Sequence, residues 1–179
     1  MVSIIFEVHA TTFDNELQRG SGHSDVDLSP TGVKQAEEMR ARYAGKNMAA
    51  VFCSDLKRST KTAEIAFSGT GVTIVSDSRL RECDYGDYTR KPSAEIKKLK
   101  VTRIDTPFPD GQSYAQTTDL AKRFLKDLKI NYDGKTVLVI GHAATQYALE
   151  HLLKGVSLRD AIEAPWAWQP GWFYELNEL

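Results

Sequence analysis

The chain has 179 residues, of which 41% are hydrophobic and 26% charged, and its formal net charge is −1. This composition excludes a mainly disordered or low-complexity chain, and the length predicts a single domain, residues 1–179, with a sizeable core. Without a basic surplus, the chain is not expected to bind nucleic acid or an anionic membrane surface.

The N-terminal residues and the cysteines indicate a cytoplasmic protein. The opening MVSIIF lacks the basic segment of a signal peptide, and Glu7 interrupts the apolar run too early for a membrane span. Cys53 and Cys83 have no CxxC spacing, so we interpret them as packing residues in a reducing compartment, with one disulfide between them as the alternative.

Five short apolar runs, rich in β-branched residues, predict β-strands. They cover residues 2–8, 49–54, 72–76, 136–142 and 172–176. The run at 136–142, TVLVIGH, is apolar without alternation, which is typical of a central strand covered on both faces. The last run ends the aromatic stretch PWAWQPGWFYEL (165–176), which we interpret as core packing rather than a carbohydrate or partner surface.

Helical patterns lie between these strands. One begins at Pro30 with Ser29 as its N-cap. Its predicted buried face is formed by Val33, Ala36, Met39 and Tyr43. A second pattern spans 112–129, and a third, AATQYALEHLL, follows His142. Alternating strands and helices predict an α/β fold with a mostly parallel central sheet.

Two histidines and an arginine follow three of the predicted strands. His9 follows the first strand, Arg58 comes shortly after the second, and His142 ends the fourth. Ligands bind at the carboxyl ends of the strands in such sheets, so we expect these side chains to meet around one site. A single histidine at a strand end usually has a structural role. Two histidines and an arginine at matching strand ends are harder to explain in that way.

These residue types suit the transfer of a phosphoryl group. A neutral imidazole such as that of His9 can attack phosphorus and form a covalent intermediate. Arg58 and His142 would stabilise the phosphoryl oxygens, and Glu82 is the candidate proton donor. The neighbouring alternatives for the donor are Asp84 and Asp87, whereas His23 and His151 are interpreted as non-catalytic.

Six sequence blocks strengthen this interpretation. They are VHATT (8–12), GHSDVDLSPTG (22–32), SDLKRSTKTA (54–63), LRECDYGDY (80–88), PFPDGQSY (107–114) and VLVIGHAAT (137–145). In this order they resemble the motifs of the histidine phosphatase superfamily, the phosphoglycerate-mutase-like enzymes. The resemblance covers essentially the whole chain and implies a three-layer α/β/α sandwich.

The resemblance also implies residue roles. His9 corresponds to the phosphorylated histidine, Arg58 to the second phosphate-binding arginine, Glu82 to the proton donor and His142 to the second histidine. Asn15 stands where the family has an asparagine. Asn15 and Thr12 are therefore candidate phosphate contacts, with loop capping as the alternative. No cofactor or metal is implied.

Several positions depart from the family pattern. The arginine that precedes the first histidine is replaced by Val8, the next glycine by Ala10, and two glycines after the second histidine by Ala143 and Ala144. Gln112 stands where glutamate is usual. Loss of a bidentate arginine costs roughly a hundredfold in rate or more. It is also expected to leave His9 more often protonated near neutral pH. Arg81 and Arg90 are the candidate replacements.

The sequence therefore predicts a metal-independent phosphatase that hydrolyses a small phosphorylated metabolite through a phosphohistidine at His9. Mutases of the family tend to carry inserted segments around the site, so hydrolysis is favoured over a phosphoglycerate-type mutase. A degenerate relative that binds a phosphorylated ligand or partner with little or no turnover is the main alternative. A metallohydrolase comes last, because the chain has no HExxH or comparable spacing. The sequence names neither the leaving group nor the oligomeric state.

Overall fold

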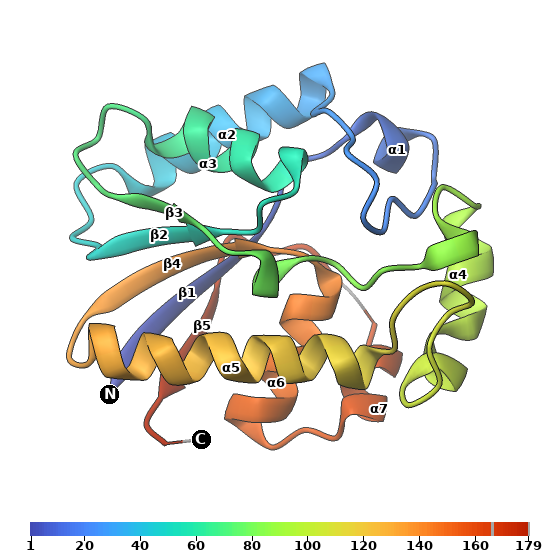
Figure 1. Cartoon of the computed structure of the whole chain (residues 1–179). Helices are drawn as coiled ribbons and strands as arrows, with labels where there is room; N and C mark the ends of the chain where they lie inside the picture. The colour runs from blue at the N-terminus through green and yellow to red at the C-terminus, as the bar shows by residue number, and fades with distance from the viewer. Residues whose placement is uncertain (166, 179) are drawn as a thin grey trace.

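A five-stranded sheet forms the centre of the computed structural model, which describes residues 1–165 and 167–178 (Figure 1). Its strands are β1 (Val2–Val8), β2 (Ala50–Cys53), β3 (Ile74–Ser76), β4 (Thr136–Gly141) and β5 (Trp172–Leu176). The order across the sheet is β3-β2-β4-β1-β5. All neighbours are parallel except β5, which runs antiparallel to β1 at one edge. The five predicted strands are confirmed.

Helices cover both faces of the sheet. The α-helices are α1 (Phe13–Glu16), α2 (Pro30–Tyr43), α3 (Lys57–Phe67), α4 (Ser93–Leu99), α5 (Tyr114–Tyr132), α6 (Ala143–Lys154) and α7 (Leu158–Glu163). Short 3₁₀ segments are η1 (Ser78–Leu80), η2 (Gly86–Tyr88) and η3 (Lys100–Arg103). Figure 1 shows α2 and α3 on one face of the sheet and α5 and α6 on the other. The predicted three-layer α/β/α sandwich with a mostly parallel sheet is confirmed.

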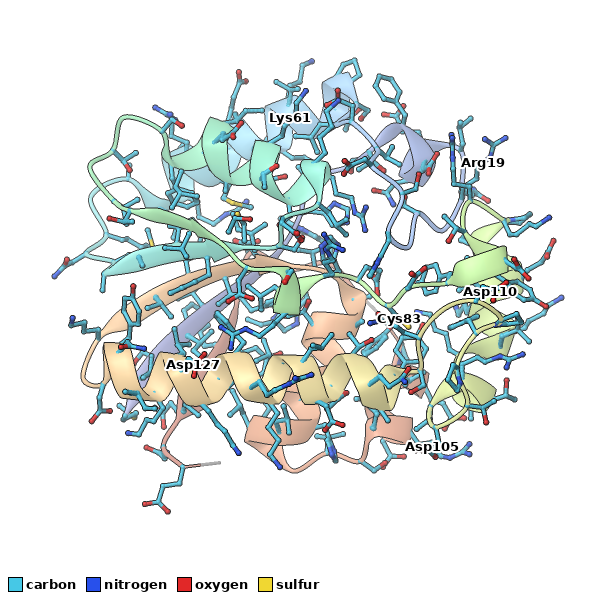
Figure 2. The ribbon with its side chains drawn as sticks, in the orientation of Figure 1. Arg19, Lys61, Cys83, Asp105, Asp110 and Asp127 are labelled. Carbon is cyan, nitrogen blue, oxygen red and sulfur yellow. The ribbon has the colours of Figure 1, made fainter. Side chains whose placement is uncertain are left out.

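Alternating side chains of β1 build a core on each face of the sheet. Phe6 belongs to the cluster that contains Phe124 of α5, whereas Ile5 belongs to the cluster that contains Met39 of α2. The two buried cysteines are free thiols, as expected for packing residues. Charged side chains such as Lys61 of α3 and Asp127 of α5 lie on the outer surfaces of the helix layers (Figure 2).

The buried face of α2 differs from the prediction at one position. Ala36, Met39 and Tyr43 are buried, as expected, but Val33 is 38% exposed. Gly32 takes the inner position instead, because a Cβ there would lie 2.0 Å from the carbonyl oxygen of Thr11. The close approach of α2 to the loop after His9 therefore requires a glycine and turns Val33 outward.

The helix predicted over 112–129 needs correction at both ends. It begins at Tyr114, with Ser113 as its N-cap, and runs on to Tyr132.

The aromatic stretch, residues 165–176, is packed only in part. Trp172 is buried in the core. Trp168 and Phe173 are 57% and 68% exposed, so the packing interpretation is wrong for these two rings. Trp166 lies outside the described residues. Among the helices described, none combines the length and apolarity needed to cross a membrane.

Candidate active site

His9 and His142 meet at the carboxyl edge of the sheet, where adjacent strands β1 and β4 end. Their ring centroids are 4.9 Å apart. His9 Nδ1 lies 2.8 Å from the carbonyl oxygen of Ala10. A carbonyl oxygen can only accept, so Nδ1 carries the hydrogen and the lone pair is on Nε2. The local backbone thus sets the tautomer in which Nε2 can act as a nucleophile.

His9 is neutral near pH 7. Burial, and then the positive charge of Arg58, lower the pKa of His9 to about 3. The prediction that the loss of an arginine at Val8 leaves His9 more often protonated is therefore wrong, because burial exerts the larger effect and Arg58 supplies a cation.

Arg58 lies in the first turn of α3 and is 2% exposed. Its Nη1 donates to the carbonyl of Ser24 at 3.1 Å and its Nη2 to the carbonyl of Gly22 at 2.8 Å. Its buried Nε has no hydrogen-bond partner in the described chain. An unpaired buried donor is costly, and an anionic ligand would relieve that cost.

His142 is fully buried, at 0% exposure, and is the N-cap residue of α6. Its Nε2 lies 2.6 Å from Ser54 Oγ, whereas its Nδ1 has no partner among the described residues. Burial, and then Arg58 and His9, lower the pKa of His142 well below its usual range. The ring is a neutral, pre-oriented group with one nitrogen left for a ligand.

Glu82 is held between two chain segments that meet at this edge. Its Oε1 accepts from the backbone N–H of Cys83 at 2.8 Å and from that of Ala144, in the first turn of α6, at 3.3 Å. The residue is 8% exposed and lines the cleft in front of His9. Asp84 and Asp87, the alternative donors, are not among the residues that line the cleft.

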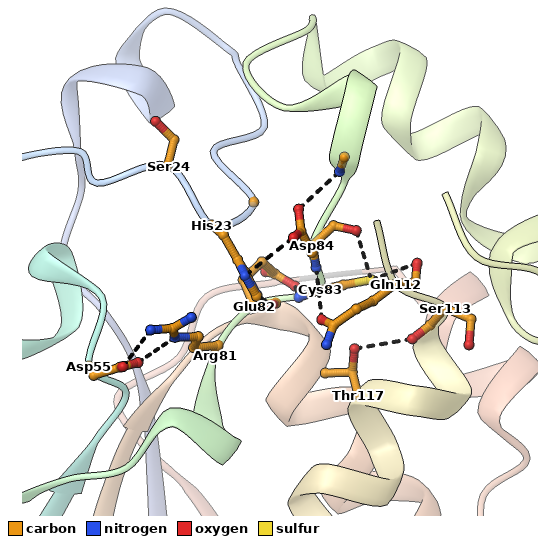
Figure 3. A network of polar contacts seen from close by, with 12 residues as sticks. His23, Ser24, Asp55, Arg81, Glu82, Cys83, Asp84, Gln112, Ser113 and Thr117 are labelled. Carbon is orange, nitrogen blue, oxygen red and sulfur yellow. Dashed lines mark hydrogen bonds and ion pairs between the residues drawn. The ribbon is translucent and has the colours of Figure 1, made fainter. Parts of the chain in front are cut away.

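A polar network around Glu82 contains residues that the sequence did not single out as partners (Figure 3). His23 Nε2 lies 2.8 Å from the carbonyl oxygen of Glu82, and His23 Nδ1 lies 3.5 Å from Asp84 Oδ2. Gln112 Oε1 accepts from the backbone N–H of Asp84 at 3.2 Å. His23 therefore holds the segment that carries Glu82. No spacing signal connects it to Glu82, because the contact joins distant loops.

Thr12 and Asn15 form a cap at the start of α1. Asn15 Oδ1 accepts from the backbone N–H and from Oγ1 of Thr12, at 3.0 and 2.9 Å. Thr12 is 0% exposed and is not among the cleft residues, whereas Asn15 lines the cleft. The capping alternative therefore accounts for Thr12. With its Oδ1 engaged, Asn15 is oriented by the same cap.

An open cleft of about 1230 Å³ lies in front of His9. Val8 lines it and packs against the cluster that contains Phe6. Neither candidate replacement for the missing arginine is among the cleft residues, and neither are the buried Arg58 and His142, so the distinction between them rests on their hydrogen-bond partners. Arg81 forms two 2.6 Å hydrogen bonds with the carboxylate of Asp55, and Arg90 pairs with buried Asp14 at 3.1 Å.

The cationic side chains that line the described cleft are Arg42, Lys97 and Lys100. In the part of the chain that the structure describes, no group of three or more His, Cys, Asp or Glu side chains is arranged to hold a metal ion.

The low histidine pKa values predict that stability falls as the solution becomes acidic. Between the unfolded pKa of 6.5 and the folded pKa of about 3, His9 is neutral in the folded state but protonated in the unfolded state. The free energy of unfolding therefore rises with pH in this window and falls by up to about 1.4 kcal/mol per pH unit for each such histidine as the pH drops. Urea denaturation across this range should show a shallower pH dependence for His9→Gln than for the wild type, and equal slopes would contradict the neutral state.

Comparisons with known proteins agree with this geometry. A family model described as the histidine phosphatase superfamily (branch 1) matches residues 4–168. Phosphoserine phosphatase 1 of Hydrogenobacter thermophilus is 26% identical over 166 residues, covering 88% of this chain and 79% of that protein. The uncharacterized phosphatase PhoE of Bacillus subtilis is 30% identical over 149 residues, covering 83% and 76%.

The solved structure of YhfR from Bacillus stearothermophilus shares the fold, with a TM-score of 0.87 and 23% identity over 99% of this chain and 92% of that one. The match of the family model over most of the chain establishes the relationship that the motifs and the paired histidines indicate. The chain belongs to the histidine phosphatase superfamily.

Proposed function

We propose that the protein is a phosphomonoesterase that transfers a phosphoryl group to His9 and then to water, without a metal ion. The observation that carries this proposal is the combination of a neutral His9 with a free Nε2 lone pair and two buried polar atoms without partners in the described chain, Arg58 Nε and His142 Nδ1. A phosphoryl group bound there would receive hydrogen bonds that the unliganded site leaves unmade.

In the first step, His9 Nε2 attacks phosphorus and the bond from phosphorus to the ester oxygen breaks. Arg58 Nε and His142 Nδ1–H donate to the phosphoryl oxygens, with His142 Nε2 accepting from Ser54 Oγ–H. The leaving oxygen takes a proton from the Glu82 carboxyl, whose other oxygen is held by two backbone N–H groups.

In the second step, water attacks the phosphorus of phospho-His9. The carboxylate of Glu82 takes a proton from this water, the nitrogen–phosphorus bond breaks, and inorganic phosphate leaves with His9 neutral again. The two steps restore every group to its starting state. The overall reaction is hydrolysis of a phosphomonoester, and the names of the two relatives as phosphatases favour this class of reaction.

One observation favours the second candidate function, in which the protein binds a phosphorylated ligand with little or no turnover. Val8 contributes no charge, and the two candidate replacements, Arg81 and Arg90, are paired with Asp55 and Asp14. The phosphoryl site thus has one arginine where the family pattern has two.

A turnover screen separates the two functions. Phosphosugars, phosphoglycerates, nucleotides, phosphoserine peptides and p-nitrophenyl phosphate are each incubated with the wild type and with His9→Ala, with and without a chelator. A phosphatase of this kind releases phosphate from at least one compound, loses at least about a thousandfold in rate in His9→Ala, and keeps its rate in the chelator. Binding without turnover in the wild type would favour the second candidate, and loss of activity in the chelator would contradict the metal-independent mechanism.

A further inference from the structure

Arg42 lines the same cleft as His9 but belongs to the opposite end of α2 from the phosphoryl site. Gln35, in the first half of α2, accepts from the backbone N–H of Thr11 at 2.8 Å and so marks the end of the helix beside the His9 loop. From Gln35 to Arg42 the helix rises by about 10 Å. The cleft is larger than the roughly 300–1,000 Å³ typical of small-molecule pockets, so it has room for a leaving group that extends along α2.

The Arg42 guanidinium is held by a carboxylate that interrupts the apolar pattern of β1. Glu7 is 1% exposed, and its Oε1 accepts from Arg42 Nη1 and from Tyr43 Oη, both at 2.7 Å. A buried carboxylate is costly unless it is paired, and these two donors satisfy it. The pair fixes the position of the guanidinium at the wall of the cleft.

Two aromatic rings lie near this guanidinium. Arg42 Cζ lies 5.8 Å from the ring centroid of Tyr43 and 5.6 Å from that of Trp168. The Arg42 side chain is 23% exposed, and its one recorded hydrogen bond among the described residues is the bond to Glu7. A planar guanidinium that keeps free N–H groups at the wall of a cleft suits bidentate recognition of a carboxylate or phosphate.

The geometry points to Arg42 as the receptor for a second anionic group of the substrate, a carboxylate or phosphate bound away from the phosphoryl group that is removed. This inference rests on the proposed function, because it assigns the phosphoryl group to His9. It restricts the substrate class to phosphomonoesters whose leaving group carries a distal negative charge. Glu38, one turn earlier on α2, also lines the cleft and disfavours a second anion placed closer to the histidines.

Two other cations line the cleft, and they come from α4 and η3. Lys100 Nζ donates to Tyr147 Oη at 2.7 Å, so its ammonium group is partly engaged. Lys97 is an exposed residue of α4. Neither has the combination of a buried counter-ion and flanking rings that holds Arg42.

Binding of a matched pair of phosphonates tests the assignment without any need for turnover. One probe is a benzylphosphonate with a para carboxyethyl arm, and the other is its carboxamide. Calorimetry is performed on the wild type, on Arg42→Gln, which can still donate to Glu7, on Lys100→Ala and on Arg40→Gln. Arg40 is a matched control on the same helix, because its guanidinium donates to the carbonyls of Ile65 and Ser68 and does not line the cleft.

We expect the wild type and Arg40→Gln to bind the carboxylate about tenfold more tightly than the carboxamide, on the scale of one charge-assisted hydrogen bond. The preference should disappear in Arg42→Gln. Three results would overturn the inference and leave the proposed function standing. The wild type could bind both probes equally, the preference could survive in Arg42→Gln, or the preference could be lost in Lys100→Ala instead. Failure of both probes to bind the wild type would count against the phosphoryl site itself, and so against both proposals.

Discussion

Replacement of Arg58 by methionine is expected to lower kcat/KM for any phosphoester substrate by about a hundred- to a thousandfold, the range found when one preorganised donor to a developing anion is removed. Methionine fills much of the same volume but offers no hydrogen-bond donor. Steady-state kinetics on the best substrate of the turnover screen measure the loss. Wild-type efficiency in Arg58→Met would contradict the placement of the phosphoryl group beside this guanidinium.

Because Arg58 also donates to the carbonyls of Gly22 and Ser24, Arg58→Met loses two loop contacts as well as the ligand contact. A second readout separates these effects. Arg58 is the second largest cause of the low pKa of His9, so its removal should raise that pKa toward 6.5. NMR titration of the His9 ring protons measures this change. A disturbance of the loop at residues 22–24 alone would lower the activity but leave the pKa of His9 unchanged.

Introduction of arginine at the position of Val8 is expected to raise kcat/KM by about ten- to a hundredfold. Val8 lines the cleft directly before His9, and a second guanidinium there can bind the phosphoryl oxygens bidentately. Since His9 is already neutral, the gain comes from stabilisation of the phosphoryl group and not from deprotonation of the nucleophile.

The control for this gain is Val8→Met, which removes the β-branch and lengthens the side chain without adding charge. Efficiencies of Val8→Arg and Val8→Met that match the wild type would mean that other groups already satisfy the phosphoryl oxygens. A gain in both variants would assign the effect to packing against the Phe6 cluster rather than to charge.

The strands and the sheet could be predicted because the apolar runs are continuous and end at turn residues or polar residues. The helix starts at Ser29 and Ser113 were readable to within about two residues, the usual uncertainty of helix ends. Val33 and Trp168 were misplaced for a shared reason. Each lies beside a tertiary contact, one formed by Gly32 with Thr11 and the other by Arg42 with Trp168, and periodicity carries no information about such contacts.

The site was predictable only in part. Strand ends and motif order located His9, Arg58, Glu82 and His142. The sequence did not indicate that Arg58 and His142 are buried, because burial depends on which segments fold over a side chain; for Arg58 these include residues 22–24. The roles of His23 and Glu7 were equally hidden, since each is defined by a side-chain contact between segments far apart in the chain.

The most direct test of the central claim is to trap the phosphorylated intermediate. The wild type is mixed with substrate, quenched in alkali, where phosphohistidine persists, and digested for mass spectrometry. We expect one added phosphoryl group on the peptide that contains His9, on its Nε2, and none in His9→Ala. A phosphoryl group on another residue, or turnover by His9→Ala at the wild-type rate, would contradict the claim.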